Sequence, residues 1–159
     1  MKLLKSNRGF TLVELVVVIA VIALIMAGVA LSIGMGRKAG SVSSAASKMR
    51  TIEAGLHEYK TYKGAIPAQA EMSTTWPVAL EAYVSSELRA GGAEPHGYQC
   101  AAATKTATIR TPAFTNAAEA GDVKTKLIDQ GLCESDSTVT AANEVDCVVA
   151  TLKGTAGCI

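Results

Sequence analysis

Residues 10–36 read FTLVELVVVIAVIALIMAGVALSIGMG, and this stretch decides the fold because it is apolar along its length and carries one charge, Glu14. A transmembrane helix needs about 20 predominantly apolar residues, so the stretch is long enough to span a bilayer. A carboxylate near a bilayer centre costs roughly 2.5–3.5 kcal/mol and usually has a function. We therefore expect a membrane-length helix in which Glu14 has a specific task.

Residues 1–9 read MKLLKSNRG, a short leader without acidic residues. Its three cations are Lys2, Lys5 and Arg8. Cations before an apolar segment favour the cytoplasmic side, although Arg37 and Lys38 behind it weaken this bias. Without the leader cations, 12 Lys and Arg remain against 14 Asp and Glu, so no basic stripe indicates a nucleic-acid site.

The amino-terminal segment has three interpretations. A secretory signal peptide would be cut after Ala30, behind small residues, but Glu14 interrupts the apolar region that such a peptide needs. A plain signal anchor explains the length and gives Glu14 no task. The third interpretation treats residues 9–14, GFTLVE, as one unit.

This third unit is typical of a known processing site. Residues 8–15, RGFTLVEL, resemble the cleavage site of type IV pilins and of their pseudopilin relatives. The resemblance implies that a prepilin peptidase cuts between Gly9 and Phe10 and methylates the Phe10 amine. Residues 1–9 are then the prepilin leader peptide, and residues 10–36 form a transmembrane and filament-core helix.

Glu14 and the new Phe10 amine are suited to pair with each other. Each charge alone has a desolvation cost in or near hydrocarbon, and an ion pair between them offsets part of it. Glu14 lies about one helical turn beyond Phe10, so the contact can form within one chain, and it can also join neighbouring subunits. The alternative is a glutamate that extends to the membrane interface.

An amphipathic continuation is expected at residues 37–63, because apolar residues recur there at intervals of three and four. These positions are Val42, Ala45, Met49, Ile52, Leu56 and Tyr59. One helix would thus run from Phe10 to Tyr62, roughly 80 Å at about 1.5 Å per residue, and end at Lys63-Gly64. Glycines between Gly28 and Gly40 either soften this helix or allow close helix packing.

Residues 64–159 are expected to form a globular α+β head with an antiparallel sheet. Residues 65–75 are interpreted as a loop, and a short helix is expected from Trp76 to Leu88 or Arg89. A second helix should begin after Asn116 and reach Asp129. The predicted strands are residues 98–104, 106–111, 138–140 and 145–152. A long amino-terminal helix on such a sheet also resembles the type IV pilin fold.

The four cysteines are Cys100, Cys133, Cys147 and Cys158. An even number behind a membrane-targeting segment predicts two disulfides in an oxidising compartment, and the sequence alone leaves three connectivities open. The carboxy-terminal part resembles the disulfide-bounded region of pilins, and on that resemblance we prefer Cys133–Cys158 with Cys100–Cys147. The same resemblance leaves the subtype, IVa or IVb, open.

The sequence indicates no catalytic chemistry, cofactor or metal site. It contains no phosphate-binding glycine loop, no H-E-x-x-H and no G-x-S-x-G. His57 and His96 are interpreted as surface residues, and the acids near the end as a solvated face rather than a calcium site. These acids are Glu134, Asp136, Glu144 and Asp146. We expect Tyr59, Tyr62 and Trp76 to anchor the helix on the sheet, and we do not expect an enzyme.

The resemblance implies a major structural subunit of a type IV pilus that polymerises through its amino-terminal helix. Its partners would be further copies, the prepilin peptidase, an assembly platform with a cytoplasmic ATPase, and the inner membrane before assembly. The finished filament would lie on the bacterial surface and serve adhesion, motility or DNA uptake. The alternatives are a pseudopilin of a type II secretion system and a signal-anchored periplasmic binding domain.

Overall fold

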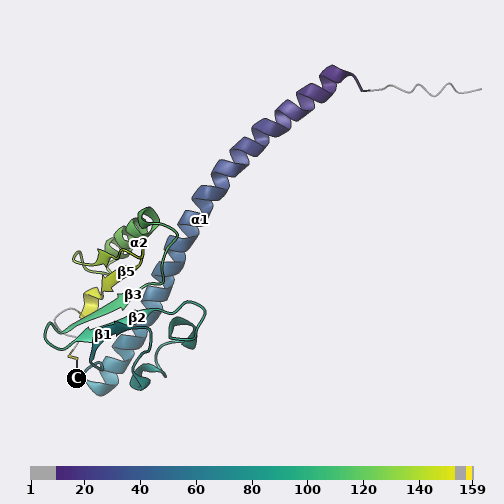
Figure 1. Cartoon of the computed structure of the whole chain (residues 1–159). Coiled ribbons are helices and arrows are strands. Elements are labelled where there is room, and N and C mark those ends of the chain that lie inside the picture. Colours follow the sequence, from purple (N-terminus) through teal and green to yellow (C-terminus); the bar gives the residue numbers. More distant parts are fainter. Residues whose placement is uncertain (1–9, 153–156, 159) are drawn as a thin grey trace, which may run out of the picture. The chain divides into compact units, whose positions relative to one another are not determined.

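A computed structural model of the chain describes residues 10–152 together with Gly157 and Cys158, and only the backbone of residues 28–39 and of Thr151 (Figure 1). The chain divides into two compact units, Met1–Ala39 and Gly40–Ile159. We call them the N-terminal unit and the C-terminal unit and describe each by itself. The predicted leader, residues 1–9, lies outside the described residues.

Helix α1 spans Leu12–Lys63 and contributes to both units. The helix ends at Lys63, as the sequence predicts. Gly64 terminates it by taking a left-handed conformation with φ 80°, and its N–H donates to the Lys60 carbonyl at 2.7 Å. The helical backbone continues through the glycine-rich stretch 28–40. The side chains of residues 28–36 in the predicted membrane segment are not described, and within the described part no helix has the length and hydropathy required to cross a bilayer.

The C-terminal unit contains a five-stranded antiparallel sheet with strand order β1-β2-β3-β5-β4. The strands are β1 Gln69–Ser73, β2 Gly97–Ala101, β3 Thr106–Arg110, β4 Thr138–Val139 and β5 Val145–Val148. The second half of α1 lies against this sheet (Figure 1). The predicted α+β class, with a long helix on an antiparallel sheet and two disulfides, is therefore confirmed and is consistent with the type IV pilin fold.

The predicted apolar stripe of α1 forms the core between helix and sheet. Ala45, Met49, Ile52 and Leu56 are buried, while Val42 and Tyr59 are partly buried against them. Burial of such side chains stabilises a fold by about 1.5–3 kcal/mol each. The sequence pattern thus located the packing face of the helix correctly.

Two of the three expected aromatic anchors pack against another ring, although neither ring contact joins the helix directly to the sheet. Trp76 stacks on Tyr98 of β2 with ring centroids 4.9 Å apart, and Tyr59 meets Tyr83 edge to face at 5.2 Å. The expectation for Tyr62 was wrong, since its side chain is 72% exposed. Tyr62 follows Tyr59 by three residues and has left the buried stripe at the end of α1.

Helix α2, Ala117–Asp129, begins with the predicted cap. The Asn116 side chain accepts a hydrogen bond from the Glu119 N–H at 2.9 Å, and the Glu119 carboxylate accepts one from the Thr115 N–H at 3.2 Å. These contacts satisfy amide groups that have no partner within the helix. Gly131, with φ 70°, follows the helix end as predicted.

Other predicted elements differ in extent. Two short 3₁₀ helices, η1 Val78–Leu80 and η2 Ser86–Leu88, replace the continuous helix expected from Trp76 to Leu88. Strand β1 lies in the expected loop, and the predicted last strand ends at Val148 before a third 3₁₀ helix, η3 Ala150–Leu152. The first two predicted strands correspond to β2 and β3, and their bounds agree with the prediction to within three residues.

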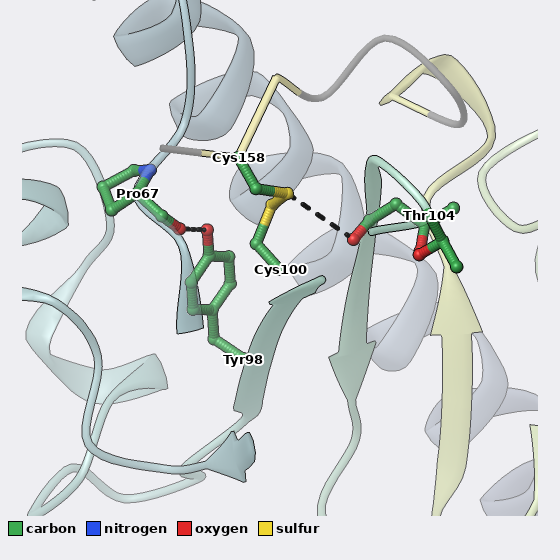
Figure 2. Close-up of a disulfide and its surroundings, with 6 residues drawn as sticks. Pro67, Tyr98, Cys100, Thr104 and Cys158 are labelled. Carbon is green, nitrogen blue, oxygen red and sulfur yellow. Dashed lines mark hydrogen bonds between the residues drawn. A yellow bond between two sulfur atoms is a disulfide. The ribbon is translucent and has the colours of Figure 1, made fainter. Parts of the chain in front are cut away.

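One disulfide joins Cys100 to Cys158 (Figure 2) and the other joins Cys133 to Cys147, so the preferred pairing was wrong. The sheet order explains the correction. Cys100 on β2 and Cys147 on β5 are separated by β3, and two strand spacings of about 4.8 Å exceed the usual Cα separation of bonded cysteines. Cys133 forms an isolated antiparallel β-bridge with Val149, the residue directly after β5. This backbone pairing places Cys133 beside Cys147.

Candidate assembly site at the start of helix α1

A reciprocal cap links Thr11 and Glu14 where α1 begins. The Glu14 carboxylate accepts hydrogen bonds from the Thr11 N–H at 2.9 Å and from the Thr11 hydroxyl at 2.8 Å. The Thr11 hydroxyl in turn accepts the Glu14 N–H at 3.3 Å. Thr11 immediately precedes the helix and Glu14 is its third residue, which is the geometry of a capping box.

The cap determines the chain conformation around the predicted cleavage site. Because the helix starts at Leu12, Phe10 lies outside it and its side chain is 85% exposed. Gly9 lies outside the described residues. The contact expected between Glu14 and a Phe10 amine is not formed in this uncleaved chain, in which the Phe10 nitrogen belongs to a peptide bond and Thr11 holds the carboxylate.

The first turns of α1 expose apolar side chains on every face. The large apolar side chains from Phe10 to Met26 are between 48% and 85% exposed within the N-terminal unit. A helix that is apolar all round is normally buried in a large core, in a membrane or among other helices. Contiguous exposed apolar surface of this kind marks an interaction site.

Thr11 is the residue that the sequence interpretation missed. Glu14 was paired with Phe10, and Thr11 was given no role of its own. The signal was available, since a threonine followed three residues later by a glutamate, directly before an apolar run, is a capping-box pattern. The cysteines do not join this site; they lie in the C-terminal unit and are 9% exposed or less.

His96 is buried, so its interpretation as a surface residue was wrong. Its ring Nδ1 lies 2.8 Å from the Glu94 carbonyl, and its own carbonyl accepts the Trp76 indole N–H at 2.8 Å. Burial lowers the pKa of His96 below its ordinary value, and the nearby Lys48 charge acts in the same direction. The backbone carbonyl of His96 thus connects the loop before β2 to Trp76 of the core, while its buried ring bonds within that loop.

Two of the late acids form a cross-strand cluster with Arg110 of β3. The guanidinium donates to both Asp146 carboxylate oxygens, at 2.6 and 2.7 Å, and lies 3.5 Å from Glu144. These hydrogen bonds raise the pKa of Arg110. Among the residues that the structure describes, no group of three or more His, Cys, Asp or Glu side chains is arranged to hold a metal ion.

One comparison with known proteins matches the start of the chain. A family model described as the prokaryotic N-terminal methylation motif matches residues 4–30. No curated protein and no solved structure matches the chain significantly. The matched range contains the predicted cleavage site, Thr11, Glu14 and most of the exposed apolar turns. The chain therefore carries, at residues 4–30, a methylation motif typical of type IV pilins and pseudopilins, which implies processing by a prepilin peptidase and assembly into a filament.

Proposed function

We propose that this chain is the structural subunit of a type IV pilus and has no catalytic role. The observation that carries the proposal is the all-round apolar exposure of α1 from Phe10 to Met26, within the range of the methylation motif. Exposed helical surface of this extent is stabilised when copies pack side by side, because each copy removes apolar area from water or lipid.

Cleavage after Gly9 changes the chemistry at the start of the helix. It frees a Phe10 amine, and methylation leaves that amine able to carry a positive charge. The Glu14 carboxylate, held at the helix start by Thr11, then has a cationic partner on its own chain or on an adjacent copy. An ion pair between copies sets their register, while the apolar side chains supply the buried area.

The C-terminal unit forms the outer part of the subunit in this proposal. Its two disulfides join β2 and β5 to other parts of the unit, and such bonds suit a protein in an oxidising environment. Before assembly the precursor is stored in the inner membrane, as the methylation motif implies, and the finished filament stands on the cell surface. Adhesion, motility and DNA uptake are the activities that such a filament serves.

The test is to shear filaments from cells that express the native chain and to sequence the amino terminus of their main subunit. We expect N-methyl-Phe10 as the first residue. A processed protein that stays in the inner membrane without surface fibres would favour a pseudopilin. A chain that still begins at Met1 would identify an anchored domain and overturn the proposal.

A further inference from the structure

The two disulfides are nested along the chain. Cys100 is bonded to Cys158, and Cys133–Cys147 lies inside the interval that this bond spans. The first cysteine is therefore bonded to the fourth, and the second to the third. A chain that joins each cysteine to the next one would instead form Cys100–Cys133 and Cys147–Cys158, and we call these two bonds the sequential pairs.

The order of export favours the sequential pairs. Because the leader cations favour the cytoplasmic side, the cysteines cross the membrane in the order of their numbers. Cys100 and Cys133 thus reach the oxidising side before Cys147. Cys147 and Cys158 are 11 positions apart, fewer than the 14 between Cys133 and Cys147, and a shorter loop costs less entropy to close. Timing and distance therefore both oppose the native pairs in the unfolded chain.

The folded sheet excludes the bond between Cys100 and Cys133. Cys100 pairs with Ala107 of β3, and the Ala107 carbonyl accepts the Val149 N–H at 2.9 Å. Val149 in turn bridges Cys133. The two cysteines are thus three strand spacings of about 4.8 Å apart, well beyond the usual Cα separation of bonded cysteines, about 4.4–6.8 Å.

The other sequential pair also conflicts with the fold. Cys158 lies beside Cys100 on β2, as Figure 2 shows, whereas Cys147 lies on β5 with β3 between these strands. The native pairs have Cα separations of 5.8 and 5.2 Å, within the usual range. A chain that carries the sequential pairs therefore has to exchange them before the C-terminal unit can complete its sheet.

Burial of the cysteines limits when this exchange can take place. In the folded unit Cys100 and Cys147 are fully buried, and Cys133 and Cys158 are 3% and 9% exposed. Thiol–disulfide exchange requires a thiolate to reach one sulfur of the bond. The exchange consequently belongs to the incompletely folded chain, and folding then protects the native pairs.

We propose that this chain is a substrate of a thiol–disulfide isomerase, a protein with a reactive thiolate that converts the sequential pairs into the native pairs. Each first bond is formed by a dithiol oxidase, whose own disulfide accepts two electrons from two chain thiols. The inference goes beyond the proposed function and rests only on its export step, so it holds for a pilin and for a pseudopilin alike.

The exchange is balanced and needs no further oxidant. When the isomerase thiolate attacks the Cys133 sulfur, the Cys100–Cys133 bond breaks and Cys100 leaves as a thiolate. Cys100 then attacks the Cys158 sulfur, which forms Cys100–Cys158 and releases the Cys147 thiolate. Cys147 attacks Cys133 in the mixed disulfide, which forms Cys133–Cys147 and returns the isomerase thiolate. Two chain disulfides exist before and after.

The test follows the pairing of the full-length chain in bacterial cells that export it, with and without their periplasmic disulfide isomerase. An alkylating reagent stops exchange soon after synthesis, and linked peptides are mapped without reductant. Trypsin and a glutamate-specific protease cut between all neighbouring cysteines, for example at Lys105, Glu134 and Lys153. The peptides therefore distinguish the three connectivities.

We expect native pairs to predominate in cells that contain the isomerase. Without it, native pairs should make up no more than about a third of the oxidised chains, the share that random choice among three connectivities gives. The sequential pairs should be the most abundant species there. Resupplying the isomerase should restore the native pairs, whereas an isomerase without its attacking cysteine should not.

Two variants that retain one native pair each are the matched controls. The first combines Cys133→Ser with Cys147→Ser, and the second combines Cys100→Ser with Cys158→Ser. Neither chain can form a wrong internal bond, so both should oxidise to the same extent with and without the isomerase. Their readout is the linked peptide itself, which does not require the variant to reach full stability.

The outcomes separate this inference from the proposed function. Predominantly native pairs in cells without the isomerase would overturn the inference alone. A two-cysteine variant that needs the isomerase would overturn it as well, because the isomerase would then not act by exchanging wrong bonds. Cysteines that stay reduced in both strains would show that the chain never reaches an oxidising compartment, and both proposals would fail. Expected pairing without surface fibres would count against the pilus alone.

Discussion

Gly55 of α1 lies directly beneath the backbone carbonyl of Tyr83, so close that a Cβ at position 55 would collide with it. The contact brings the segment after η1 onto the helix and allows the edge-to-face contact between Tyr59 and Tyr83. A glycine that costs about 1 kcal/mol of helix propensity is therefore required here for packing.

Replacing Gly55 should consequently destabilise the C-terminal unit. We expect Gly55→Ala to lower the free energy of unfolding by about 1–3 kcal/mol, because the backbone of residue 83 must move. Gly40→Ala is the matched control, since a Cβ there meets nothing within 4 Å and should instead gain about 1 kcal/mol. Chemical denaturation followed by circular dichroism measures both; equal effects would contradict the packing role.

The contribution of Glu14 to the helix cap and the contribution of its charge can be tested separately. We expect Glu14→Ala to abolish or strongly reduce filaments while cleavage after Gly9 persists. Glu14→Gln keeps an oxygen for the Thr11 N–H but removes the charge, so it should fail like Glu14→Ala if the Phe10 amine is the essential partner. Fibre yield and amino-terminal mass report assembly and cleavage, and a native yield from Glu14→Ala would remove the role assigned to this residue.

Substitution of Thr11 should lower the fibre yield less than substitution of Glu14 does. Thr11→Val removes the hydroxyl that both donates to and accepts from Glu14, and loss of such a cap costs about 1 kcal/mol. We expect a partial loss of fibres, with faster hydrogen exchange at the Glu14 and Leu15 amides, which bond to the Thr11 hydroxyl and the Thr11 carbonyl. A complete loss of fibres from Thr11→Val would mean that the hydroxyl, and not the charge, is the critical group.

The two disulfides should contribute unequally to stability. Cys100–Cys158 spans 58 positions and Cys133–Cys147 spans 14, so the loop-entropy model assigns them about 4 and 3 kcal/mol respectively. Replacing each pair by serines, with the other pair intact, and measuring denaturant midpoints tests the order. Peptide mapping without reductant supplies the control, and a linked peptide containing Cys100 and Cys147 would contradict the observed pairing.

Acid should weaken the C-terminal unit through His96. Its pKa is lowered in the folded protein, so the unfolded chain binds more protons once the pH falls below about 6.5. Stability should be complete above that pH and decline below it, by at most about 1.4 kcal/mol per pH unit. His96→Gln, which can still donate to the Glu94 carbonyl, should flatten this part of the pH profile; an unchanged profile would exclude His96 as the cause.

Local patterns predicted the two α-helices of this fold well. The apolar stripe from Ala45 to Leu56 and the cap at Asn116 depend on neighbours within a few residues, which a sequence displays directly. Strand β1 was missed because its sequence, QAEMS, contains no β-branched or aromatic residue that would favour a strand. Its strand conformation is fixed instead by pairing with β2. The disulfide pairing failed for the same reason, since it depends on strand order.

The site residues also divide into those that a local sequence pattern indicates and those that depend on distant contacts. Phe10 and Glu14 are separated by a fixed spacing in a continuous apolar run, so their selection as site residues needed no tertiary information, and their roles stay predictions. His96 was misplaced because its burial is produced by distant partners, the Trp76 indole and the Leu88 carbonyl, which accepts the His96 N–H at 2.8 Å. The pocket lined by α1, the loop before β2 and residues 111–114 is likewise assembled from three separate segments and leaves no sequence signature.

Cys158 follows every strand of the sheet, and its partner lies on β2, the second strand (Figure 2). The bond can therefore close only after all five strands have reached the compartment where thiols are oxidised. A thiol-reactive label that still modifies Cys100 would mark chains whose export is incomplete. In the proposed pilus, closure of this bond would mark a subunit that has emerged in full before it polymerises.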